Sequence, residues 1–303
     1  MSRLEPLINK PFQLLLSEKA KEKGERAILV VAIISFCIHL ALVFLINFDI
    51  ISFRSDSILL ANPISAIYTP FSFILIYEVY LLLYYLPKSI STYISKQYEI
   101  IALIIIRKTF KDLANLDLMT NWFENKEDLL FTYDIITALI LFFLIFLFYY
   151  NSKRNSVEVE HLPERLQKFV VYKKLIATLL VPIIIILAFY TVSHWFYEVV
   201  MQGSPNNLTK DINQIFFKDF FGVMILLDVV LLLLSLFYTD KFHKVVRNSG
   251  FVISTILIRL SFSVEGLTKN VLIISAVLIG LLTLVIHNLF EERLPRKPSQ
   301  MIH

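Results

Sequence analysis

Long apolar segments recur along the whole chain, and they constrain its fold more than any other feature of the sequence. The first runs from Ala27 to Phe48 and contains no Asp, Glu, Lys or Arg. A helix needs about 20 predominantly apolar residues to cross the ~30 Å hydrocarbon core of a bilayer. Hydrophobic residues make up 57% of the chain and charged residues 18%, whereas about 25% of an ordinary soluble domain is charged. The sequence therefore predicts an all-α integral membrane protein.

Eight segments are candidates for membrane spans. The third and the seventh are short, and each contains one arginine, Arg107 or Arg259. A plain hydropathy window passes over such segments and reports six spans instead. The charges of the connecting segments decide between the two counts. The eight candidates are 27–48, 69–87, 98–114, 130–150, 174–197, 217–238, 250–264 and 271–290.

The basic residues of the connecting segments agree with eight spans. Cytoplasmic loops carry an excess of Lys and Arg, and with eight spans and a cytoplasmic N-terminus every inner segment contains at least two of them. A six-span topology inverts the orientation between the second and fourth spans and loses this agreement. We therefore predict that both termini are cytoplasmic and that the protein lies in a plasma membrane, with the bacterial inner membrane as the expected location. The inner segments are 1–26, 88–97, 151–173, 239–249 and 291–303.

Two parts of the chain resemble each other at an offset of about 150 residues. YEVYLLLYYL (77–86) aligns with LDVVLLLLSL (227–236), and IALIIIRKTF (101–110) aligns with ISTILIRLSF (253–262). Matches of Leu and Ile are common between membrane helices, but here an acid meets an acid and an arginine meets an arginine. The alternative is convergence of two apolar sequences. We predict two parallel tandem copies of a four-helix bundle. The division is then 1–26 as a cytoplasmic or interfacial segment, 27–152 and 174–290 as the two membrane units, 153–173 as a cytoplasmic linker and 291–303 as a cytoplasmic tail.

Each predicted unit places one acid and one arginine at a similar depth. Glu78 precedes Lys88 by ten residues and Arg107 follows Lys96 by eleven, so a rise of 1.5 Å per residue puts both roughly 15–16 Å from the inner boundary. The same count puts Asp228 and Arg259 of the second unit at roughly 18–20 Å. The sequence predicts the ion pairs Glu78–Arg107 and Asp228–Arg259, facing the interior of their bundles. Such a pair either fixes helix register or belongs to a charge pathway, proton relay or field sensor.

Four further residues are secondary candidates, each with a plainer alternative. Asp134 is a third carboxylate near the outer end of the first bundle, or an interfacial residue. His39 lies in the middle of the first span, as a proton carrier or as a hydrogen-bonded core histidine. Tyr80 and Tyr84 neighbour Glu78 on the second span, where they either solvate its charge or pack as ordinary aromatic residues.

The sequence lacks the signatures of common catalytic and cofactor sites. It contains no GxxxxGK[ST], HExxH, GxSxG or CxxC, and no TVGYG-like potassium filter. The single cysteine, Cys37, cannot form a disulfide within the chain, and no Cys/His cluster has zinc-ligand spacing. The basic residues report membrane topology, so they indicate no nucleic-acid partner. We expect neither catalysis, a cofactor nor a metal.

Glycine is scarce, with 6 residues among 303. Close-packed transporter helices and broken-helix binding sites use glycine for close backbone approach and for unwinding. The scarcity argues against those folds and favours a rigid bundle. Its alternative explanation is a genome that favours Ile, Lys, Phe, Tyr and Asn over Gly and Ala.

A four-helix membrane unit with an acid opposite an arginine resembles a voltage-sensor domain in its architecture. Voltage sensors are similar to one another in carrying several arginines at every third position of the fourth helix. Here the fourth spans, 130–150 and 271–290, contain none, and each unit has one deep arginine on its third span. One charge supplies only about 2.3 kcal/mol per 100 mV. The sequence therefore excludes steep voltage sensing, and no residue role is transferred.

Two classes of function remain open from the sequence. The first is ion or proton conduction across the membrane, with the acid–arginine pairs as selectivity or gating elements. The second is a non-conducting membrane subunit that anchors partner proteins in a larger assembly. The expected partners are the lipid bilayer and either further copies of the chain or other subunits of a membrane complex.

Overall fold

A computed structural model of the chain is entirely helical in the part that it describes. That part comprises residues 5–48, 50, 63–113, 126–152, 164–200, 212–238, 241–264 and 266–293. The elements are α1 (Glu5–Leu16), α2 (Glu18–Asn47), η1 (Pro63–Ile67), α4 (Tyr68–Tyr85), α5 (Ile90–Leu113), α6 (Lys126–Ser152), α7 (Glu164–Val200), α8 (Ile212–Tyr238), α9 (Phe242–Ser261) and α10 (Leu267–Arg293).

Every predicted span overlaps one of these helices, but they differ in how well they suit a bilayer. Four stretches are long and apolar enough to cross a membrane: Asn9–Asn47, Asp128–Ser152, Gln167–Leu187 and Leu267–Arg293. Shorter apolar stretches occur in α4 and α8. The helices α5 and α9 are the least apolar, because each carries polar residues over its first turns. The structure thus shows a helical protein with four membrane-length helices.

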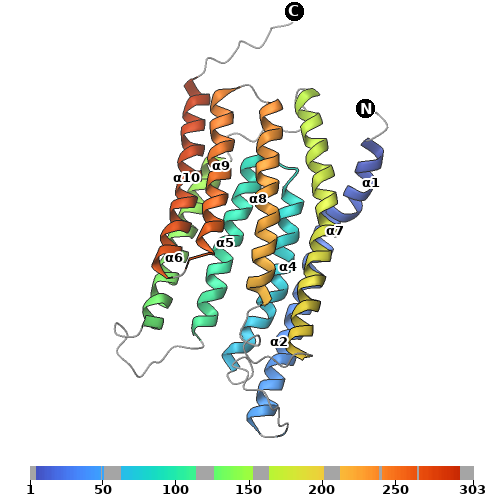
Figure 1. The fold of residues 1–303 in the computed structure, drawn as a ribbon, viewed down its shortest axis with the longest axis vertical. Coiled ribbons are helices and arrows are strands. Elements are labelled where there is room, and N and C mark those ends of the chain that lie inside the picture. The colour runs from blue at the N-terminus through green and yellow to red at the C-terminus, as the bar shows by residue number, and fades with distance from the viewer. Residues whose placement is uncertain are drawn as a thin grey trace, which may run out of the picture.

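The helices pack as two layers with one shared core. Within each half of the chain, consecutive helices are neighbours, α2–α4–α5–α6 in one layer and α7–α8–α9–α10 in the other. The layers meet where α6 contacts α10, α5 contacts α9 and α4 contacts α7. Figure 1 shows these helices side by side, with the start of α1 and the end of α10 at the same end of the molecule.

The two halves of the chain share one core. A single hydrophobic cluster takes residues from both halves, including Leu82, Ile101, Phe148, Phe251 and Val277. The reason lies in α5 and α9. Both carry buried polar residues, and helices of this kind are more stable between other helices than against lipid.

The N-terminal segment is part of the bundle, because α1 packs against α7. Leu16 is buried, and the Tyr80 hydroxyl donates to the Leu15 carbonyl over 2.9 Å. Ser17 separates α1 from α2 as an N-cap, since its side chain accepts from the Ala20 amide at 3.2 Å. The first turns of the chain are thereby tied to α4 and α7.

Glycine occurs where α9 and α10 approach most closely. A Cβ at Gly250 would lie 2.5 Å from the Thr283 hydroxyl oxygen, and one at Gly280 would overlap the Tyr98 hydroxyl. Gly250 and Ser254 are four residues apart on α9, and Ala276 and Gly280 are four apart on α10, which is the small-xxx-small pattern of close membrane helices. A few glycines therefore suffice for close helix packing when each lies at a close approach.

Candidate functional site

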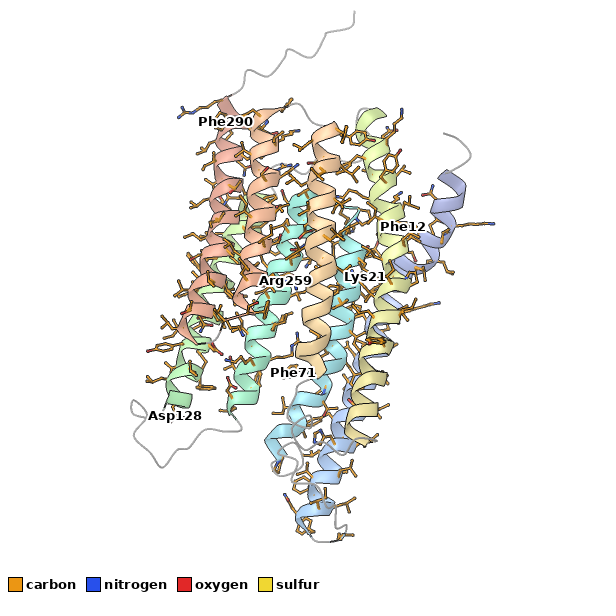
Figure 2. The ribbon with its side chains drawn as sticks, in the orientation of Figure 1. Phe12, Lys21, Phe71, Asp128, Arg259 and Phe290 are labelled. Carbon is orange, nitrogen blue, oxygen red and sulfur yellow. The ribbon has the colours of Figure 1, made fainter. Side chains whose placement is uncertain are left out.

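The first predicted ion pair is present between α4 and α5. The Arg107 Nη2 donates to Glu78 Oε2 over 2.8 Å, and both residues are buried. The Arg107 Nη1 also donates to the Phe71 carbonyl over 2.9 Å, at a position that Figure 2 labels on α4. Since a guanidinium has only donors and a carboxylate only acceptors, these contacts let each charge compensate the other. The pair is closed in this structure.

The acid of the second half has neutral partners. Asp228 on α8 is buried. Its Oδ1 accepts from the Tyr93 hydroxyl over 3.1 Å, and both carboxylate oxygens lie 3.4 Å from the Gln97 amide nitrogen. Thr255 on α9 adjoins the carboxylate. Sequence reasoning missed Tyr93 and Gln97 because it assigned 88–97 to an inner loop, whereas α5 already begins at Ile90; their spacing of four residues is the signal for one helix face.

The predicted Asp228–Arg259 pair is wrong. No ion pair joins these two side chains in the described chain, and the Arg259 Nη1 is buried without a hydrogen-bond partner. Glu78 and Arg107 are 29 positions apart, and Asp228 and Arg259 are two positions farther, which adds about 3 Å along a helix. Aspartate is also one methylene shorter than glutamate, so the second arginine does not reach its acid.

Asp228 and Arg259 nevertheless face the same small cavity between α5, α8 and α9. Its volume is about 20 Å³, and its polar lining consists of Gln97, Asp228, Thr255 and Arg259. A cavity of this kind needs a volume of about 10–15 Å³ to hold one water molecule. Arg259 reaches it from α9 in the middle of the bundle (Figure 2), beside Gly222, where a Cβ would lie 3.1 Å from Arg259 Nη1. The site is a pair of charges with room for one small molecule between them.

Asp134 belongs to a polar cluster nearer the other end of α5. Its Oδ2 accepts from Lys108 over 2.6 Å, and its Oδ1 accepts from the Asn270 amide over 2.7 Å. Lys108 also lies 3.4 Å from Asp112. Asp134 is buried, so it links α5, α6 and α10. Asp128, at the start of α6 (Figure 2), is a second buried carboxylate, whose oxygens have no hydrogen-bond partner among the described residues.

The remaining secondary candidates connect helices away from Glu78. His39 Nδ1 is hydrogen-bonded to the Thr69 hydroxyl, which ties α2 to α4. The Tyr80 hydroxyl donates to the Leu15 carbonyl near the end of α1, as described above. Tyr84 lies under the ammonium groups of Lys21 and Lys88, at 5.4 and 4.7 Å from its ring centroid. Each of the three residues therefore joins elements of the bundle through its own contacts.

A cluster that sequence reasoning missed joins the start of α9 to the end of α10. The rings of His243 and His287 stack with their centroids 5.1 Å apart. Arg247 Nη1 lies 3.0 Å from His287 Nε2, and Glu291 Oε1 lies 3.8 Å from His243 Nε2. Its sequence signal is the spacing of four between His243 and Arg247 and between His287 and Glu291. Among the residues that the structure describes, no three His, Cys, Asp or Glu side chains are placed to hold a metal ion.

Acidification should destabilise the protein through this histidine cluster. Burial is the main cause that lowers the pKa of His243 from its ordinary 6.5, Lys244, Lys241 and Arg247 lower it further, and Glu291 opposes them. The unfolded chain then binds the proton first, so stability is lost as pH falls below about 6.5. We expect thermal unfolding in detergent to shift to lower temperature between pH 7.5 and 5.5. The shift should be smaller in His243→Gln; an equal shift would show that other groups cause it.

The comparisons with known proteins indicate no function for this chain. The chain matches no protein-family model, and neither a curated protein nor a solved structure matches it.

Proposed function

We propose that this chain is an eight-span membrane protein that conducts ions or protons across a plasma membrane, the inner membrane in a bacterium. One observation carries the proposal. Asp228 and Arg259, two opposite charges in the middle of the bundle, face a common cavity and do not bind each other. A structural ion pair gains its stability from direct contact. A buried carboxylate and a half-buried guanidinium held apart around a cavity instead suit an ion pathway.

The dimensions of the less apolar helices support eight spans. A helix of 20 residues, the length of α9, extends about 30 Å, and α5 has 24 residues. Both therefore match the hydrocarbon thickness. Several of their polar residues are buried between other helices, among them Arg107 on α5 and Ser254 and Thr255 on α9. Such helices can cross a membrane without presenting those groups to lipid.

The tandem repeat is the second part of the proposal. In each half, the acid lies on the second helix and the arginine on the third, and the arginine reaches the same level of the preceding helix. Arg107 contacts Phe71, seven residues before Glu78, and Arg259 contacts Gly222, six residues before Asp228. This correspondence favours duplication of a unit whose second copy has since lost its direct ion pair.

Flux measurements in proteoliposomes test conduction. The wild-type protein should carry an ionic current above that of protein-free liposomes under an imposed gradient. Arg259→Gln should lower that flux by at least about fivefold, equivalent to about 1 kcal/mol in a barrier. Asp112→Asn is the control, since its half-exposed pair with Lys108 contributes little. Absence of flux in correctly folded, monodisperse protein would contradict conduction.

A membrane subunit that anchors partner proteins is the second candidate. The closed Glu78–Arg107 pair and the close α9–α10 contact favour it, because both make the bundle rigid. This function expects stable partners to copurify from native membranes and expects Arg259→Gln to leave the purified protein without any change in ion flux.

A further inference from the structure

We infer that the species passing the cavity between Asp228 and Arg259 is a proton, carried by one water molecule that both side chains hold. This inference rests on the proposed conduction and names its substrate. It follows from the size of the cavity, from the hydrogen-bonding capacity of its two charged side chains and from the nature of the remaining wall.

Arg259 supplies the donor side of the site. A guanidinium has five N–H donors and no acceptor, and the Nη1 of Arg259 is buried with no hydrogen-bond partner in the part of the chain that the structure describes. A buried donor of this kind is normally satisfied by a protein acceptor or by water. The cavity beside it, of about 20 Å³, fits one water molecule and little more. A water oxygen can accept from Arg259 while its hydrogens remain free.

Asp228 supplies the acceptor side. Its oxygens already have three neutral neighbours, Tyr93, Gln97 and Thr255, and a carboxylate has about four acceptor positions. A water held by Arg259 can therefore donate into the remaining capacity of Asp228. The predicted pair of the second half is then restored through one bridging molecule, whereas Glu78 and Arg107 bind each other directly.

The lining of this cavity is poorly suited to bind metal cations or anions. Hard cations such as Ca²⁺ take about 6–8 oxygen ligands, and a potassium filter replaces the hydration shell with carbonyl oxygens. Here the rest of the lining is apolar, with Leu82, Ile100, Ile101, Met224, Ile225 and Ile258. The guanidinium repels cations and the carboxylate repels anions. A proton needs no coordination shell and moves along hydrogen bonds.

The transfer step balances with water alone. A proton arriving at the bridging water passes to Asp228: one O–H bond of the hydronium breaks, one forms on the carboxylate, and neutral water remains. Arg259 favours neutral water over hydronium, so the proton moves on to the acid. In the reverse step on the other side, the O–H bond of the acid breaks, a second water accepts the proton, and the carboxylate returns.

Ion-selective flux separates this inference from the function on which it rests. Wild-type proteoliposomes under equal gradients of H⁺, K⁺ and Cl⁻ should pass H⁺ only. Asp228→Asn should lower the H⁺ flux about a hundredfold, the lower end of the effect of a positioned proton-transfer group. Asp112→Asn, the same substitution at the half-exposed pair with Lys108, should leave it unchanged. A flux of K⁺ or Cl⁻ as large as that of H⁺ would overturn the proton assignment alone, and no flux of any ion would overturn conduction itself.

Two further measurements keep the inference testable if Asp228→Asn does not fold. Gly222→Ala places a methyl group 3.1 Å from Arg259 Nη1 and should push the guanidinium into the space of the water, lowering H⁺ flux in a folded protein. Solid-state NMR of the wild type in bilayers should show magnetisation transfer from water to the Arg259 guanidinium but not to that of Arg107, the matched arginine with protein acceptors. If the Arg259 guanidinium receives no magnetisation from water, or if the H⁺ flux of Gly222→Ala is unchanged, the bridging water is contradicted.

Discussion

Gly280→Ala should destabilise the protein by about 3 kcal/mol, the upper part of the range for overpacked cores. The new Cβ would overlap the hydroxyl oxygen of Tyr98 and lie 2.9 Å from its Cζ. Tyr98 cannot move aside, because it is fully buried, packs edge-on against Phe148 with ring centroids 5.1 Å apart, and its hydroxyl lies 2.7 Å from Ser254 Oγ. Thermal or denaturant unfolding in detergent measures the loss.

The same site offers a rescue and a control. Tyr98→Phe removes the hydroxyl that the new methyl group meets, so Gly280→Ala should be less damaging in that background, with a coupling of about 0.5–3 kcal/mol. Gly24 is the control, since a Cβ there approaches nothing closer than 4.0 Å. In a helix, Gly24→Ala should stabilise by up to about 1 kcal/mol. Equal effects at Gly280 and Gly24 would show that α9 and α10 do not approach Tyr98 as described.

Arg107→Met should cost about 3–5 kcal/mol, because it leaves the Glu78 carboxylate buried without its partner. Glu78 has a relative exposure of 4%, and Arg107 is the residue that bonds it in this structure. Glu78→Leu combined with Arg107→Met should recover most of the loss, since a well-packed apolar pair is often as stable as a buried ion pair. Unfolding of the three variants under one condition gives the comparison.

Lys96→Met is the matched control for the loss of a cation. Its pair with Glu99 has a separation of 2.7 Å, close to that of Glu78–Arg107, but both side chains are partly exposed, at 23% and 32%. A pair of this kind contributes about 0–1 kcal/mol. If the double variant is as unstable as Arg107→Met, the arginine stabilises the bundle by its packing and its bond to Phe71 rather than by compensating Glu78.

Sequence alone predicted the class of protein and the first ion pair, because both depend on features that the chain carries locally. Apolar length gives a membrane helix whatever surrounds it, and Glu78 and Arg107 lie on consecutive helices of one hairpin. The pair of the second half failed because a depth count ignores side-chain length. Two extra residues and the shorter aspartate are enough to separate Asp228 from Arg259.

The shared core and the polar network could not be predicted, because they depend on contacts between the two halves. Tyr93 and Gln97 bind an acid more than 130 positions away, and the stacked histidines lie on two different helices. No local pattern reports such partners. The predicted start of α5 was also too late. Because residues 88–97 were assigned to a loop, Tyr93 and Gln97 were not considered as partners of Asp228.

The two-layer arrangement also has a consequence for biosynthesis. Ribosomes make α5 before α8 and α9 exist, so Tyr93 and Tyr98 at first lack the groups they later bind, Asp228 and Ser254. The first half is thus an incomplete product until translation ends. The core that both halves share is therefore completed only when the helices made last pack beside those made first.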